Sequence, residues 1–309
     1  GKLSKRNRDE QIAGSRVEVA PFKRDPADFV LWKPSNEMQP GWNSPWGFGR
    51  PGWHTECSAM SEKTLGLPFD IHGGGRDLTF PHHENEIAQS CCSSANINDP
   101  KSYVNYWMHN GFVTVHGEKM SKSLGNISLV KDLMKDNHGE VIRLSLLSSH
   151  YRQALDWNDN VIHQAKKLLD KLYKILADIE DVEVSKINDS SLEFISPLLD
   201  DLNTPGLLAN LNKMIKDFRS ISNEDLPKFK SKMLLATNLM GICQENYLDW
   251  FSHNDKNLDT HKVAKLISER LDAKKKKDFE KADKIRQKLL DMGVEIKDTE
   301  SGTEWNLKS

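Results

Sequence analysis

The chain has 309 residues, with 43 Lys and Arg against 45 Asp and Glu and a formal net charge of −2. This length predicts a substantial core and two or three domains, and the balanced charge excludes a global basic field, so that any nucleic-acid surface must be local. No apolar stretch approaches membrane-spanning length, and the first residues lack the apolar core of a signal peptide. Four irregularly spaced cysteines argue against a disulfide framework and predict a reducing, cytoplasmic compartment.

Composition changes along the first half of the chain. Residues 21–72 are rich in Trp, Gly and Pro, above all at 42–53, which favours turns and loops over long helices. A helix is predicted from about Pro81 to Ser90, since Pro fits an early helical position. The apolar residues from Tyr103 to Val115 indicate a strand or a buried helix.

Beyond Trp157 the apolar pattern is helical. Between residues 161 and 179, apolar side chains recur every three or four positions, as a helix packed in a bundle requires. A second helix is predicted to open at Thr204-Pro205, where Thr can cap and Pro fits the first turn. The polar stretches 181–191 and 252–259 are predicted to link helical units.

One polar run suits a polyphosphate. Residues 117–126 read GEKMSKSLGN, with Lys119 and Lys122 among serines and glycines. Lysine supplies a compact cation for phosphate oxygens, and glycine lets the backbone approach closely. The alternative is a polar surface loop without a ligand.

A second group of residues suits a metal. His82 and Glu86 are four apart on the predicted helix and therefore share a face, and Cys57 lies upstream. A thiolate, an imidazole and a carboxylate can hold zinc with one coordination position open. The alternative is a small buried thiol beside an ordinary pair on a helix face.

The motifs resemble a known family. Residues 119–123 (KMSKS) resemble the loop that closes over ATP in class I aminoacyl-tRNA synthetases, and residues 52–60 (GWHTECSAM) and 71–86 (IHGGGRDLTFPHHENE) resemble cysteinyl-tRNA synthetases. The resemblance covers nearly the whole chain, to Trp305. It implies a partial Rossmann-like α/β catalytic domain in residues 1–150, an all-α bundle in 151–255 and an anticodon-binding region in 256–309.

The resemblance also implies roles for single residues. The family holds one zinc ion with two Cys, one His and one Glu, three of which match Cys57, His82 and Glu86. The substrate thiol would bind this metal, with Trp53 and His72 beside it. His83, the second histidine of its pair, is expected to support the site rather than bind zinc. Cys91, Cys92 and Cys243 match no ligand position.

The implied reaction joins cysteine to ATP and then to tRNA. Gly75-Arg76-Asp77 resembles the Gly-x-Asp element that holds the ATP ribose. Lys122, with Lys119 beside it, would stabilise the pyrophosphate charge while Mg²⁺ accompanies ATP. The anticodon region is expected to use three residues that resemble family positions: Phe279, Asp283 and Trp305. The expected protein is a cytoplasmic monomer that engages no membrane.

The resemblance has one departure and leaves two alternatives. The HIGH-type element and the first zinc cysteine of the family have no counterpart in these residues. We therefore expect the chain to begin inside the catalytic domain and to be inactive alone. The alternatives are a tRNA-independent ligase that joins cysteine to an amine, which should lack the anticodon region, and a non-catalytic RNA-binding fragment.

Overall fold

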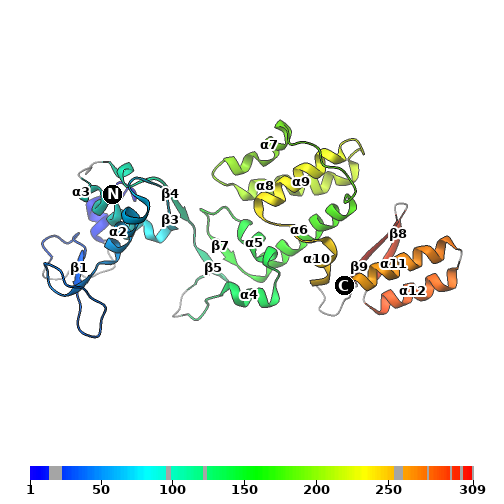
Figure 1. Ribbon diagram of the computed structural model, residues 1–309, viewed down its shortest axis with the longest axis horizontal. Helices are drawn as coiled ribbons and strands as arrows, with labels where there is room; N and C mark the ends of the chain where they lie inside the picture. The colour runs from blue at the N-terminus through cyan, green and yellow to red at the C-terminus, as the bar shows by residue number, and fades with distance from the viewer. Residues whose placement is uncertain are drawn as a thin grey trace. The chain divides into compact units, whose positions relative to one another are not determined.

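The computed structural model describes residues 1–13, 23–94, 99–120, 124–253, 260–276, 278–292, 294–299 and 302–307. The chain forms two compact units (Figure 1). The first comprises Gly1–Met120 and Tyr151–Asp156, and the second comprises Ser121–His150 and Trp157–Ser309. The chain thus leaves the first unit after residue 120 and returns for six residues at 151–156. The three-domain division at residues 150 and 255 stays a prediction.

The first unit is an α/β structure with short strands. Its helices are α1 (Arg8–Ala13), α2 (Trp53–Leu65) and α3 (Glu84–Ser93), with a π-helical turn (Thr79–His83) before α3. Its strands are β1 (Trp32–Pro34), β2 (Gly49–Pro51), β3 (Phe69–Gly75), β4 (Val104–Asn110), β5 (Val113–Val115) and β6 (Glu118–Lys119). A further strand, β7 (Leu155–Trp157), ends one residue beyond the unit. The predicted helix at 81–90 is confirmed, and of the two alternatives for residues 103–115, a strand or a buried helix, the structure shows strands.

The centre of this unit is a βαβ arrangement. Strands β3 and β4 run parallel, in register from Phe69 opposite Val104 to Gly75 opposite Asn110, and α3 lies in the connection between them. Five buried residues form the core beneath: Phe69, Ile87, Cys91, Tyr103 and Val104. In such a sheet, ligands bind beyond the carboxyl ends of the strands.

One prediction for this unit is wrong. The Gly- and Pro-rich composition of residues 21–72 favoured loops, yet α2 occupies Trp53–Leu65 in 13 residues. The run 40–52, rich in Gly and Pro, ends at Gly52, which is the N-cap, and the 13 residues of the helix contain neither Gly nor Pro. A window that averages across this boundary therefore hides the helix.

The second unit is mainly helical. Its helices are α4 (Val130–Asp136), α5 (Gly139–Leu147), α6 (Asp159–Asp178), α7 (Asp189–Ile195), α8 (Thr204–Asp217), α9 (Leu226–Met240), α10 (Tyr247–His253), α11 (Thr260–Lys275) and α12 (Phe279–Asp291). Strands β8 (Val294–Thr299) and β9 (Gly302–Leu307) form an antiparallel hairpin. The predicted amphipathic helix is α6, whose Leu169 and Leu172 are fully buried. None of the described helices is both long and apolar enough to cross a membrane.

Two details differ from the sequence predictions. The cap of α8 is Asn203, whose side chain accepts a hydrogen bond from the Gly206 amide, whereas the Thr204 hydroxyl donates to the Leu147 carbonyl. Both residues can cap a helix, so the pattern fixed the position to within one residue. The predicted linker 181–191 includes the start of α7 at Asp189, and most of 252–259 lies outside the described residues.

A buried carboxylate ties α5 to the turn after α9. Glu140 is 5% exposed and accepts hydrogen bonds from the Cys243 amide at 2.8 Å, the Gln244 amide at 2.8 Å and the Tyr173 hydroxyl at 3.0 Å. The Tyr173 ring stacks on Trp250, with centroids 4.5 Å apart. Because a buried charge is costly without partners, these bonds make Glu140 a structural anchor of the helices.

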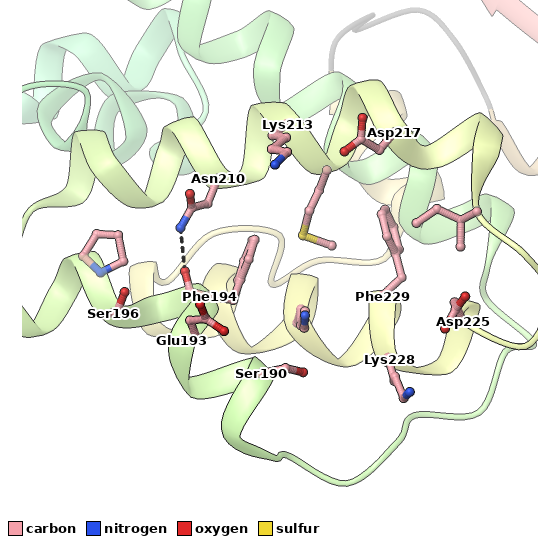
Figure 2. A pocket seen from close by; sticks show the side chains of 14 residues that line it. Ser190, Glu193, Phe194, Ser196, Asn210, Lys213, Asp217, Asp225, Lys228 and Phe229 are labelled. Carbon is pink, nitrogen blue, oxygen red and sulfur yellow. Dashed lines mark hydrogen bonds between the residues drawn. The ribbon is translucent and has the colours of Figure 1, made fainter.

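A cavity of about 630 Å³ lies among α7, α8 and α9 (Figure 2). Phe194 and Phe229 are among its lining residues, and the Asn210 amide donates a hydrogen bond to the Phe194 carbonyl. Three basic and three acidic side chains line it: Lys213, Lys228, Lys232, Glu193, Asp217 and Asp225. This balance favours neither an anion nor a cation, and no residue of the candidate site described next lines it.

Candidate metal and nucleotide site

The predicted metal ligands come together in the first unit. Cys57 lies on α2, His82 in the π-helical turn after β3, and Glu86 on α3. One ligand atom from each lies within 4.8 Å of the others. Helix α2 and the later segment formed by the π-helical turn and α3 therefore bring together a thiol, an imidazole and a carboxylate, the donor set that zinc accepts.

Glu86 is the most enclosed member of this group. Its side chain is 0% exposed, and its Oε2 accepts a hydrogen bond from the Tyr103 hydroxyl at 2.8 Å. Its Oε1 lies 2.6 Å from Nε2 of His82 but has no hydrogen-bond partner within the described residues. Burial raises the pKa of Glu86 to about 7. A buried oxygen without a donor is suited to a cation.

His82 is oriented by two aromatic neighbours. The Trp53 ring stacks on the His82 ring, with the ring centroids 4.2 Å apart. Nδ1 of His82 lies 2.7 Å from Nδ1 of His54 in a hydrogen bond. Its Nε2 faces Glu86. Burial, with a smaller contribution from neighbouring histidines, lowers the pKa of His82 to about 4. The ring is therefore neutral at pH 7, the form that binds metals.

The thiol of Cys57 completes the group in its protonated form. Burial, followed by the nearby charge of Glu86, raises the pKa of Cys57. Without a cation the thiol stays protonated, whereas a bound metal would favour the thiolate. The group therefore has the electrostatics of a site that is completed by a positive ion.

A second set of side chains backs the first. His72, His83 and Glu86 also have ligand atoms within 4.8 Å of one another. Nε2 of His72 lies 3.3 Å from Oε2 of Glu86, and Nδ1 of His83 lies 2.8 Å from Nε2 of His109. Burial lowers the pKa of His83 to about 3 and also lowers the pKa of His72. These imidazoles are neutral at pH 7, so none supplies a counter-ion for Glu86.

One predicted substrate residue, Trp53, and one predicted ATP residue, Asp77, line the same cavity, whereas the other predicted substrate residue, His72, is not among its lining residues. A cavity of about 580 Å³ is lined by Trp53, His82 and Asp77, among others. A Cβ added at Gly75 would lie 2.5 Å from Oδ1 of Asp77, so only glycine lets this carboxylate lie against the end of β3. The structure therefore brings the predicted ribose-binding carboxylate and the predicted metal ligand His82 to one cavity.

Residues 117–126, which contain Lys119 and Lys122 and are called the lysine loop, include three residues, 121–123, that the structure does not describe. Lys119 ends β6 and is exposed, with Nζ 5.5 Å above the centre of the Phe112 ring. Lys122 lies outside the described residues. The predicted pairing of these two lysines on one phosphate chain is therefore not tested by the structure.

The predicted tRNA residues lie at the carboxyl end of the chain. Phe279 begins α12 and is 62% exposed, and Asp283 follows one turn later on the same helix and is also exposed. Trp305 belongs to β9, where the structure describes the backbone alone. A solvent-exposed phenylalanine at a helix start is available to stack on a base, as RNA recognition requires.

Comparison with known proteins places the chain in a family. Residues 1–167 match the sequence profile of the tRNA synthetases class I (C) catalytic domain. The chain is similar to proteins named "Cysteine--tRNA ligase" from Parvibaculum lavamentivorans, with 50% identity over 100% of the chain, and from Xanthomonas campestris pv. campestris, with 49% identity over 99%. The chain belongs to the cysteine–tRNA ligase family of class I synthetases. It covers 66% of the length of each of these two relatives.

A solved structure shows a more distant likeness. It is the ternary complex of Agrobacterium radiobacter K84 agnB2 LeuRS with tRNA and LeuAMS, with 15% identity, a TM-score of 0.46 and coverage of 65% of this chain and 32% of that one. This likeness is too distant to carry an argument. The cysteine–tRNA ligase assignment rests on the sequence relatives and the class I profile.

Three residues around the candidate site escaped the sequence analysis. His54, Tyr103 and His109 contact His82, Glu86 and His83 respectively through hydrogen bonds. No spacing rule links them, because the contacts span 28, 17 and 26 residues. Only composition could have indicated them, because five of the 11 histidines of this chain lie from residue 54 to residue 109.

Proposed function

We propose that this chain forms part of an enzyme that attaches cysteine to its tRNA through a cysteinyl-adenylate made from ATP. The observation that carries the proposal is the convergence of Cys57, His82 and the fully buried Glu86 beside a cavity that Asp77 also lines. A soft donor set next to a nucleotide-sized space that the Asp77 carboxylate lines suits an enzyme that must select a thiol and activate its carboxylate.

Zinc fits the three side chains. Oε1 of Glu86 is buried and accepts no hydrogen bond from the part of the chain that the structure describes, and the His82 ring is neutral. Cys57, His82 and Glu86 would hold the ion and leave a coordination position for the substrate. When bound, zinc favours the thiolate of cysteine over the hydroxyl of serine, and this difference supplies specificity without an editing step. The resemblance implies one zinc ion per chain.

The other side chains bind and orient the substrates. Trp53 would form a wall of the cysteine pocket through the face that does not stack on His82, and His72 would lie beside the amino acid. Asp77 would accept a hydrogen bond from the ATP ribose. Lys119 and Lys122 would stabilise the charge that develops on pyrophosphate as the α-phosphate bond breaks, with Mg²⁺ on the leaving group.

The helical part would engage the tRNA. We assign the bundle within 151–255 to support of the tRNA body and residues 256–309 to the anticodon. The exposed Phe279 would stack on an unpaired base, and Asp283 would contact a base edge. Trp305 is proposed as a further contact on the family resemblance. A cytoplasmic monomer is the working state that we propose.

The test measures the two half-reactions of the full-length protein. We expect cysteine-dependent exchange of pyrophosphate into ATP, and transfer of radiolabelled cysteine to tRNA. Exchange without transfer to tRNA, but with transfer to a small amine, would favour the amine ligase. Binding of tRNA without exchange would favour the RNA-binding fragment, and neither activity would overturn the proposal.

Matched variants separate the two roles. Cys57→Ser should abolish both half-reactions and lower the zinc content, because a hydroxyl is a poor zinc ligand. Phe279→Ala should leave pyrophosphate exchange unchanged and raise the KM for tRNA, because stacking on a base contributes about 1–3 kcal/mol. Asp272→Ala, an exposed change on α11, is the control for the second variant.

A further inference from the structure

The hairpin that leads into Lys119 is small. Strand β5 contains three residues and strand β6 two. The two strands pair with each other in an antiparallel manner, and Thr114 lies opposite Lys119. The two residues of the turn, His116 and Gly117, have φ angles of 51° and 79°. Positive φ at both positions is the type I′ turn that matches the twist of the strands. Such a short hairpin is marginally stable alone and needs support from its neighbours.

Asp156 provides this support from another strand. β7 lies on the opposite side of β5 from β6. Oδ1 of Asp156 accepts a hydrogen bond from the Thr114 hydroxyl at 2.8 Å and another from the Gly117 amide at 2.6 Å. One carboxylate oxygen therefore fixes both a strand and the turn of the hairpin. Hydrogen bonds to a charged acceptor are about twice as strong as those between neutral groups.

The backbone around Asp156 holds it in place. The Gly111 amide donates to the Tyr151 carbonyl at 2.7 Å, and the Leu155 amide donates to the Phe112 carbonyl at 2.9 Å. A side chain at Gly111 would clash with the carbonyl of Gln153, so glycine permits this close approach. Residues 151–156 are thus fastened to the segment that precedes and forms β5, which limits the positions that Asp156 can adopt.

Lys119 rests on the same segment. Its ammonium lies 5.5 Å above the ring of Phe112, a distance at which a cation and an aromatic face attract. Displacement of the turn at Gly117 would shift Lys119, which lies two residues further along, and with it the start of the loop. The hydrogen bonds of Asp156 therefore bear on the position of the first lysine.

We propose that Asp156 is a positioning residue for Lys119: through Thr114 and Gly117 it sets where this lysine meets the polyphosphate of ATP. This inference rests on the proposed function. Asp156 itself makes no contact with the substrate, and its effect passes through the hairpin.

The charge of Asp156 and its hydrogen bonds have opposite expected effects on ATP binding. Asp156 is a negative charge near a loop that binds a polyanion, so its charge alone disfavours ATP. If charge were its only effect, removal of Asp156 would strengthen ATP binding and speed adenylation. A positioning role predicts the opposite result, because the hairpin loses both hydrogen bonds.

The test compares three variants of the full-length protein by cysteine-dependent pyrophosphate exchange. Asp156→Ala should lower kcat/KM for ATP about 10-fold, as expected when one or two charge-assisted hydrogen bonds are lost. Asp156→Asn keeps an oxygen that can accept both hydrogen bonds, so its kcat/KM for ATP should stay within about threefold of wild type. A small loss is expected because a neutral acceptor forms weaker bonds than a carboxylate. Asp159→Ala removes an exposed carboxylate three residues away and should change exchange less than twofold, as surface changes usually do.

Further measurements separate positioning from general damage. Zinc content, the KM for cysteine and transfer of cysteine from preformed adenylate to tRNA should be unchanged in Asp156→Ala. If that variant folds poorly, Thr114→Val removes one of the two bonds and should lower kcat/KM for ATP about threefold. A kcat/KM for ATP at or above wild type in Asp156→Ala, beside an active wild-type protein, would overturn this inference alone. Equal losses in Asp156→Asn and Asp156→Ala would also overturn it, whereas absence of exchange in wild type would overturn the proposed function as well.

Discussion

Oε1 of Glu86 lies 2.6 Å from Nε2 of His82, and the two side chains are 0% and 6% exposed. A carboxylate and an imidazole that lie this close together and are buried from solvent would ordinarily share a proton. Here burial lowers the pKa of His82 to about 4 and raises the pKa of Glu86 to about 7, so both groups resist charge near neutral pH. A divalent ion between Cys57, His82 and Glu86 would relieve this tension, because it stabilises the carboxylate that burial disfavours.

Replacement of Glu86 by Gln should therefore reduce metal affinity. The amide keeps the size of the side chain but removes the charge, and we expect the affinity for Zn²⁺ to fall at least 10-fold, the lower end of what the loss of supporting groups costs. Competition with a chromophoric chelator measures this affinity. Glu62→Gln, an exposed change on α2, is the control, and equal affinities for the two variants would exclude Glu86 as a ligand.

Stability of the metal-free protein should fall in mild acid. Burial lowers the pKa of His82 to about 4 and of His83 to about 3, whereas both would titrate near 6.5 when unfolded. Between about pH 6.5 and 4 the unfolded chain binds more protons at these rings, so their contribution is lost as pH falls below 6.5. Three more histidines shift in the same direction: His54, His72 and His109.

Glu86 acts with the opposite sign. Its pKa is raised from 4.5 to about 7, so the folded state binds the extra proton between these values and gains stability as pH falls. Five histidines outweigh one carboxylate. We expect the free energy of unfolding in urea, with chelator present, to decrease steadily from pH 6.5 to 5. A value that is constant or rises over this range would contradict the neutral histidine cluster.

Two neighbouring glycines of β3 should respond differently to alanine. A Cβ at Gly74 would lie 2.8 Å from Cε1 of His83, whereas one at Gly73 would lie an ordinary 3.6 Å from the Met108 carbonyl. Gly74→Ala should cost about 1–3 kcal/mol through overpacking and should displace the His83 ring. Gly73→Ala is the matched control. Urea unfolding measures both, and equal stabilities would show that His83 moves aside freely.

The anchor of the helical unit can be tested through Glu140. Glu140→Ala leaves the amides of Cys243 and Gln244 without their acceptor, at about 1–3 kcal/mol for each buried group. We expect the free energy of unfolding to fall by about 3 kcal/mol or more. The fluorescence of Trp250, which stacks on Tyr173, reports the unfolding. Glu183→Ala, an exposed change between α6 and α7, should stay near wild type. A loss below about 1 kcal/mol would mean that water satisfies the two amides.

Local patterns predicted the elements that have a long apolar repeat, and missed elements that are short or that lie at a change of composition. The period of apolar residues located α6, and the spacing of His82 and Glu86 placed both on one side of the site. Helix α2 was missed because its cap, Gly52, ends a Gly- and Pro-rich run. The β8–β9 hairpin joins strands that are neighbours in the sequence, and it was missed because its alternation of apolar residues, Val294 and Ile296, is too short to indicate a strand.

The candidate site was predictable as a list of ligands but not as a geometry. Spacing indicated that His82 and Glu86 share a helix face, and donor chemistry and the family resemblance added Cys57. The structure brings the ligand atoms of the three residues together. The Tyr103 hydroxyl on Glu86 and the His54 ring on His82 join elements far apart in sequence. Only the folded chain defines which atom of each side chain is left without a donor.

The return of residues 151–156 to the first unit bears on how the chain tolerates cutting. The segment 121–150 leaves and re-enters a region where hydrogen bonds fasten both flanks: Gly111 and Phe112 on one side, Tyr151 and Leu155 on the other. A single protease cut inside that excursion would leave two pieces that are still joined through β5 and β7. The nicked protein should therefore migrate as one species until it is denatured.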